Sequence, residues 1–113
     1  MASVIRGSDN FDSAAGAGLK AWVNFNGTGT VAIRAAYNVS SITDNGTGNY
    51  TVNFTTAMPD GNYSAVVSTD NNGQSCTSNL ANSSLTTTNF KIFVLNSTPA
   101  FLDSVVLTAA VFR

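Results

Sequence analysis

The stretch Asn49–Thr55, NYTVNFT, decides the fold class. Tyr50, Val52 and Phe54 alternate with asparagine and threonine, so one face of this segment is apolar and the other polar. Side chains that alternate with a period of two are typical of a β-strand with one buried face and one wet face. The stretch therefore predicts a strand in an antiparallel sheet.

Working outward from this strand, similar short segments recur on both sides. We expect strands at residues 21–25, 31–37, 38–43, 63–69, 90–95 and 105–112. Asp44-Asn45-Gly46 and Pro59-Asp60-Gly61 predict tight turns between them. Residues 71–88 are polar and predict a long loop with at most one short strand. The chain is therefore interpreted as all-β, a small antiparallel β-sandwich of about 7–8 strands spanning residues 20–113. Residues 1–19 are interpreted as an extended N-terminal connector.

The composition excludes many functions. The chain has 113 residues, a net charge of -1, no histidine and one cysteine, Cys76, and its sequence contains no glutamate. Catalytic triads, Cys-His dyads and histidine-ligated zinc cannot be built from these residues, so we expect no enzyme, metal or cofactor. The charge gives no footprint for nucleic acid, and no apolar run is long enough for membrane insertion. The N-terminal residues lack the apolar core of a signal peptide, so secretion by that route is not expected.

The remaining candidate residues for metal binding or catalysis are the aspartates, several of which lie in turns. Asp44-Asn45-Gly46 and Asp70-Asn71-Asn72-Gly73 offer oxygen ligands that suit calcium, but turn formation explains both of them. We expect a structural role for Asp103, which would accept backbone amides or pair with Arg34 or Lys20.

The aromatic residues divide by their neighbours. Trp22 alternates with Ala21 and Val23, which predicts that its ring lies at a surface or an interface. Tyr37 and Tyr63 share faces with apolar residues, which predicts that both lie in the core. A sugar-binding surface formed by these aromatics and nearby asparagines is an alternative.

The two C-terminal strand segments are apolar on both faces, as Phe93, Leu95 and Val106 show. Such segments are buried on both sides, either against another subunit or under covering loops. We favour a subunit interface. The residues expected to line it are Phe11, Trp22, Phe93, Leu95, Val106 and Phe112.

A long run resembles a known module. Residues 20–64, KAWVNFNGTGTVAIRAAYNVSSITDNGTGNYTVNFTTAMPDGNYS, and the ending DSVVLTAAVF at 103–112 are similar to the C-terminal tip module of tailed-bacteriophage tail fibre proteins. The resemblance implies a virion structural protein, made in the host cytoplasm, that forms the homotrimeric tip of a fibre. It also implies attachment to a bacterial host-surface receptor, for which a glycan is one candidate. A phage decoration protein or a stand-alone carbohydrate-binding module is the alternative.

Residues 71–88 show no resemblance to that module. Loops on a rigid scaffold commonly carry binding function, and this segment is rich in amides and hydroxyls that can hydrogen-bond sugars. We therefore predict a receptor-facing set here. It consists of Asn71, Asn72, Gln74, Ser75, Asn79, Asn82 and Ser83.

Overall fold

The computed structural model describes residues 18–70, 76–81 and 84–113. These residues form eight β-strands and no helix. The described ranges therefore contain no helix long and apolar enough to cross a membrane. The strands are β1 (Leu19–Asn26), β2 (Ala32–Tyr37), β3 (Val39–Gly46), β4 (Asn49–Phe54), β5 (Ser64–Asp70), β6 (Cys76–Leu80), β7 (Asn89–Asn96) and β8 (Val106–Phe112).

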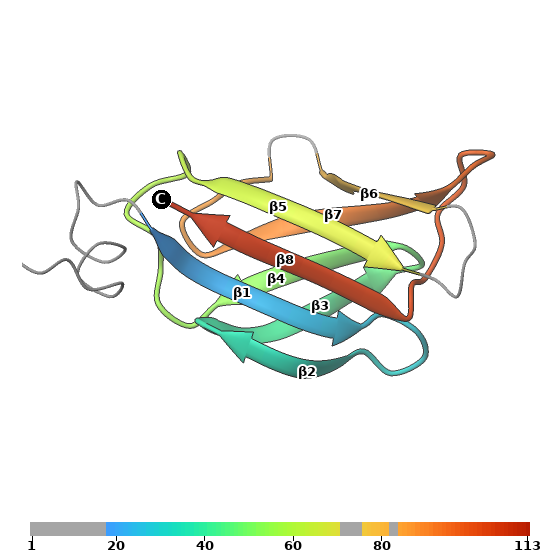
Figure 1. Ribbon diagram of the computed structural model, residues 1–113, viewed down its shortest axis with the longest axis horizontal. Helices are drawn as coiled ribbons and strands as arrows, with labels where there is room; N and C mark the ends of the chain where they lie inside the picture. The colour runs from blue at the N-terminus through green and yellow to red at the C-terminus, as the bar shows by residue number, and fades with distance from the viewer. Residues whose placement is uncertain (1–17, 71–75, 82–83) are drawn as a thin grey trace, which may run out of the picture.

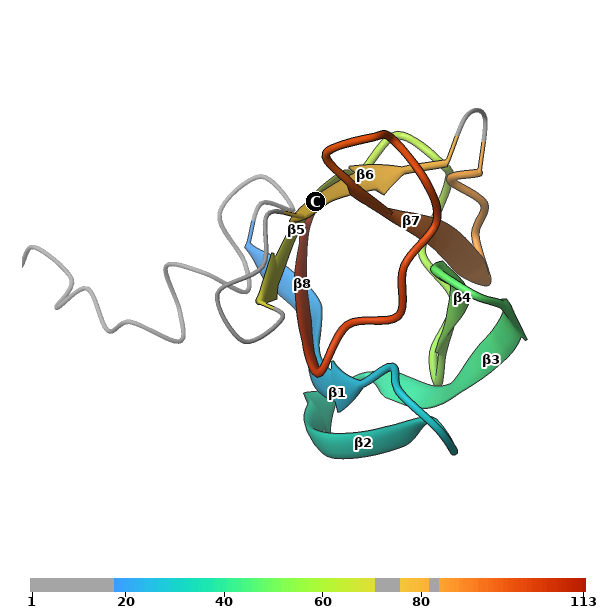
Figure 2. The same cartoon turned by 90° about the vertical axis from the view of Figure 1, so that its right-hand side faces the viewer.

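The strands form two four-stranded antiparallel sheets, with the orders β2-β1-β8-β5 and β3-β4-β7-β6. We call them the first and the second sheet. Figure 1 shows the first sheet lying across the second, and Figure 2, turned by 90°, shows one sheet on each side of the interior. The fold is consistent with a β-sandwich, as the sequence predicted.

The core consists of the inward faces of four strands. Every second residue of β1, β4, β7 and β8 is buried, because alternate side chains of a strand point to the same side. The aromatic rings pack edge to face, with 5.4 Å between the ring centroids of Phe25 and Tyr50. These core residues are Ala21, Val23, Phe25, Tyr50, Val52, Phe54, Phe90, Ile92, Val94, Leu107, Ala109 and Val111.

The two tyrosines predicted for the core have different outcomes. Tyr63 is 4% exposed, and its hydroxyl donates to the carbonyls of Thr86 and Asn89; burial raises the pKa of Tyr63 to about 12. The prediction for Tyr37 is wrong, because this side chain is 53% exposed. A register shift in the pairing of β2 with β1 interrupts the alternation, so Tyr37 pairs with the outward-facing Trp22.

A single residue carries the chain from the first sheet to the second. Asn38, between β2 and β3, has a φ of 54°, which asparagine tolerates better than most residues. Its side-chain amide donates to the carbonyls of Lys20 and Thr56, both at 3.1 Å, and its Oδ1 accepts from the Thr56 amide at 2.7 Å. These contacts fix the corner, since the side chain bonds to the start of β1 in the first sheet and to the segment that follows β4 of the second.

At the opposite end of the sandwich, Asp103 connects the segment before β8 to the second sheet. Its Oδ1 accepts the Gly48 amide at 2.9 Å and lies 2.8 Å from the Tyr50 hydroxyl. That hydroxyl also lies 2.8 Å from the Gly27 carbonyl, so its single proton is shared between two acceptors. The expectation that Asp103 accepts a backbone amide is confirmed.

Within the described residues, Asp103 forms an ion pair with neither Arg34 nor Lys20. Arg34 has other partners. It donates to the side chain of Asn24 and to the carbonyl of Val105.

Burial and the hydrogen bond to Asp103 both raise the pKa of Tyr50 above the ordinary tyrosine value.

The neighbouring Ser104 is fully buried and belongs to the same connection. Its hydroxyl accepts from the Thr69 hydroxyl at 2.5 Å and lies 2.9 Å from the Asp70 carbonyl. The Gly27 amide donates to the Ser104 carbonyl at 2.8 Å. Asp103 and Ser104 together therefore join β4, β5 and the end of β1.

Candidate functional site

The outer face of the first sheet carries a row of apolar side chains that crosses all four strands. Tyr37 of β2 pairs with Trp22 of β1, Trp22 pairs with Ala110 of β8, and Ala110 pairs with Val66 of β5. Residues paired directly across strands lie side by side on the same face. We call these four residues the apolar row.

A second pair extends the row toward the end of the sheet where β1 begins. Leu19 of β1 pairs with Phe112 of β8, next to the row. Phe112 is 44% exposed and Val66 is 60% exposed, although both are large apolar residues. Side chains of this kind, contiguous and in contact with water, mark an interaction surface more often than isolated apolar residues do.

The predicted interface residues fall on two different faces. Trp22, Val106 and Phe112 lie in strands of the first sheet and alternate with its buried residues, so they face outward from it. Phe93 and Leu95 alternate with the buried residues of β7 and face outward from the second sheet. Phe11 lies outside the described residues. Alternation in the sequence predicts on which face of its strand a side chain lies. It does not predict that the outward residues of the first sheet and those of β7 lie on opposite sides of the sandwich.

The outer face of the second sheet is largely polar, and its side chains bond to one another. Asn45 donates to the Thr51 hydroxyl at 2.7 Å, and Asn53 donates to the Thr43 hydroxyl at 3.0 Å. The ring of Phe93 is partly covered by Phe101, with 5.3 Å between the centroids. The polar side chains of this face therefore form many of their hydrogen bonds with one another.

The predicted receptor-facing set lies largely outside the described residues. Asn71, Asn72, Gln74, Ser75, Asn82 and Ser83 are not described. Asn79 lies in β6, is exposed, and pairs with Phe93 on the outer face of the second sheet. The short strand expected within residues 71–88 is confirmed as β6.

A groove of about 570 Å³ opens at the end of the sandwich where β1 begins. It is lined by Lys20, Tyr37, Asn38, residues 55–59 and Arg113. The sequence did not predict this groove, because its walls come from four separate parts of the chain. Only the outward, polar position of Thr55 was predicted, from the alternation of residues 49–55.

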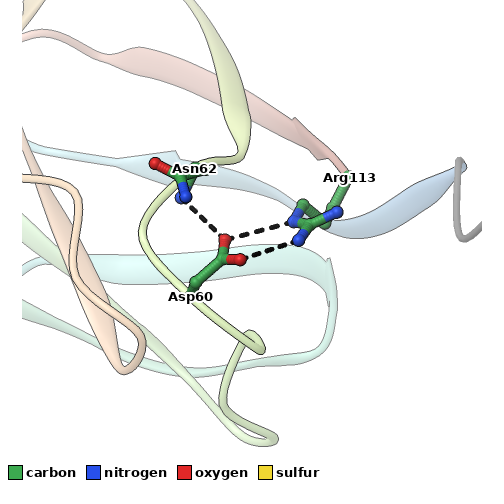
Figure 3. A network of polar contacts seen from close by, with 3 residues as sticks. All are labelled: Asp60, Asn62 and Arg113. Atoms are coloured by element: carbon green, nitrogen blue, oxygen red, sulfur yellow. Dashed lines mark hydrogen bonds and ion pairs between the residues drawn. The ribbon is translucent and has the colours of Figure 1, made fainter.

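An ion pair holds one wall of the groove in place (Figure 3). Arg113 donates from Nη2 to Asp60 Oδ2 at 2.7 Å and from Nε to Asp60 Oδ1 at 3.2 Å. Asp60 Oδ1 also accepts the Asn62 amide at 2.8 Å. The hydrogen bond from Arg113, together with that amide, holds the pKa of Asp60 below its ordinary value.

Within the described residues, no three aspartate, glutamate, histidine or cysteine side chains gather into a group that could hold a metal ion. Asp44, considered above as a calcium ligand, accepts the Gly46 amide at 3.0 Å in its own turn. The free Cys76 is half-buried and packs against the core. Comparison with protein-family models, with curated proteins and with solved structures found no match to this chain.

Proposed function

We propose that this chain is a virion structural protein, the homotrimeric tip of a bacteriophage tail fibre, which attaches to a host-surface receptor without catalysing a reaction. The resemblance of residues 20–64 and 103–112 to fibre-tip modules supports this proposal. The absence of histidine and glutamate supports a binding function over hydrolysis, since most hydrolases need such groups.

The apolar row is the observation that carries the proposal. Exposed Val66 and Phe112 lie near Trp22 on one face of the first sheet, where a monomer would leave them in water. Three copies around a threefold axis can each turn Trp22, Ala110, Val66 and Phe112 toward that axis and bury them, while Tyr37, on the edge strand β2, stays at the rim of the interface in contact with water. The hydrophobic gain is roughly 25 cal/mol for each Å² of apolar surface removed from water. The proposed interface therefore lies on the first sheet, with Trp22, Val106 and Phe112 of the expected set.

The mass in solution tests the assembly. We expect light scattering to give about three times the chain mass of 11.7 kDa. Val66→Asp adds a charge to the apolar row at a position already 60% exposed, so the single chain should still fold. This variant should have a lower mass than the wild type, because a buried unpaired carboxylate strongly opposes association.

Two further variants identify the face. Thr43→Asp adds the same charge to the polar face of the second sheet and should leave the mass unchanged. Phe93→Asp should also leave it unchanged; a loss of mass for Phe93→Asp but not for Val66→Asp would move the interface to the second sheet. A monomeric wild type would contradict the homotrimer and favour the stand-alone carbohydrate-binding module.

Attachment needs its own measurement. Residues 71–88, which include β6, can be exchanged for the corresponding segment of a related fibre, strand included. Adsorption of the phage to host cells is then measured on a protein of unchanged mass. We expect reduced adsorption. Unchanged adsorption and host range would place the receptor site elsewhere in the fibre.

A further inference from the structure

The groove beside Asn38 combines features that suit a ligand. Its volume of about 570 Å³ lies within the roughly 300–1,000 Å³ range of small-molecule sites. Its walls are formed by Tyr37, Lys20, the loop 55–59 and Arg113, which are far apart in the sequence. The one positive-φ residue other than glycine in the described part of the chain, Asn38, stands in this wall. Unusual backbone held by several hydrogen bonds is common at binding sites.

One part of the groove is apolar and the other polar. Tyr37 is 53% exposed, and Pro59 and the largely buried Met58 lie in the same wall. Thr55 and Thr56 are exposed and bring two hydroxyl groups. An aromatic ring beside hydrogen-bonding groups suits a sugar, because a sugar ring has apolar C–H faces and polar edges.

The charged residues that line the groove indicate which class of sugar could bind there. Lys20 and Arg113 both line it, and the charge of Arg113 is balanced by its ion pair with Asp60, so Lys20 carries the unbalanced positive charge. Asp60 accepts from Nε and Nη2 of Arg113, which leaves the hydrogens of Nη1 outside that ion pair. Lys20 forms no ion pair with any other residue in the described ranges. The lining therefore favours a ligand with a negative charge.

We propose that this groove binds one acidic sugar residue, such as a uronic acid of a surface glycan. The sugar ring packs on Tyr37, its carboxylate lies toward Lys20 and Arg113, and its hydroxyls reach Thr55 and Thr56. This inference deepens the proposed attachment function by naming the class of receptor. It needs neither a trimer nor residues 71–75 and 82–83.

The experiment titrates the labelled protein with D-glucuronate and, separately, with D-glucose while amide chemical shifts are followed by NMR. We expect glucuronate to shift the amides of residues 20, 37–38 and 55–59, with a dissociation constant in the millimolar range that so few contacts give. Glucose should produce much smaller shifts at the same concentration. Glucose binding as strongly as glucuronate would overturn the acidic specificity. No shift with either sugar at about 50 mM would overturn the site.

Matched variants locate the charge. Lys20→Gln should weaken glucuronate binding about threefold to fivefold, because an exposed ion pair contributes modestly. Lys91→Gln removes the same charge from the exposed face of β7 and should leave binding unchanged. Equal weakening by both variants would show a nonspecific charge effect and contradict the proposal.

A further variant tests the ring. Tyr37→Ala should weaken binding by about tenfold, since the stacking surface is lost. Unchanged binding in this variant would overturn the placement of the sugar on Tyr37. The mass of each variant, measured alongside, separates this inference from the proposed assembly. A trimer that binds no sugar would contradict only the groove as a binding site. A monomer that binds glucuronate would contradict only the trimer.

Discussion

Replacing Asp103 should destabilise the fold more than replacing any other aspartate in the described part of the chain. In Asp103→Ala the Gly48 amide loses its acceptor, and the Tyr50 hydroxyl loses one of its two acceptors. The hydroxyl keeps the Gly27 carbonyl at 2.8 Å, so only the amide is left without a partner. The effect should therefore be smaller than the loss of two independent hydrogen bonds.

The magnitude follows from these contacts. A hydrogen bond to a charged group contributes about 1.5–3 kcal/mol, and leaving a buried donor unpaired costs about 1–3 kcal/mol. We expect Asp103→Ala to lower the free energy of unfolding by about 2–4 kcal/mol. Asp103→Asn keeps a carbonyl acceptor in place of the carboxylate, and it should lose about half as much.

Urea unfolding at a fixed protein concentration, followed by the fluorescence of the single tryptophan, measures this change. The midpoint for Asp103→Ala should fall by about 1–3 M. Asp44→Ala is the control, because Asp44 also accepts one amide but in an exposed turn.

A double-mutant cycle with Tyr50→Phe gives the coupling between the two side chains, which we expect to exceed about 0.5 kcal/mol. A value near zero, or an Asp103→Ala variant as stable as the control, would refute the reasoning.

Two more perturbations test the structure. Gly48→Ala places a Cβ 2.6 Å from the Val94 carbonyl oxygen at a φ of +65°, and it should lower the free energy of unfolding by several kcal/mol. Gly29→Ala, at a φ of +57° with open space around the Cβ, should lower it by only about 1–2 kcal/mol. Similar unfolding midpoints for both variants would contradict the steric argument. The folded-state pKa of Asp60 is lowered, so its ion pair with Arg113 stabilises the fold above the ordinary aspartate pKa of 3.8 and is lost as the pH falls below that value. Asp60→Asn should therefore flatten the acid side of a stability profile measured by urea midpoints, and an unchanged profile would argue against the pair.

The strands were largely predictable because their alternation is local. The period of two in NYTVNFT corresponds to β4, whose Tyr50, Val52 and Phe54 are all buried. The prediction for Trp22 followed from the same rule, and its side chain alternates with buried neighbours. The rule failed at Tyr37, because a register shift after Asn24 reverses the face without a signal in the residue types.

The candidate sites were less predictable, since each depends on distant segments. The groove joins Lys20 to residue 113, and the apolar row needs the pairing of β1 with β2 and β8. Alternation assigns a side chain to a face but not to a neighbour on another strand. The contact of Asp103 with a backbone amide was predicted as a type of interaction, and the partner, Gly48, came only from the structure.

The pairing of β1 with β8 has a consequence for how the chain folds. The first and last strands of the described residues, β1 and β8, are the central neighbours of one sheet, with Ala21 opposite Val111 and Phe25 opposite Leu107. Nearly the whole described chain must be closed into a loop before these contacts form, and contacts between distant residues slow folding. Until β8 arrives, β5 has no partner strand in that sheet, and the inward side of Phe25 has no Leu107 to pack against. The hairpins β1–β2 and β3–β4 can form early, but acquisition of the native structure waits for the last strand.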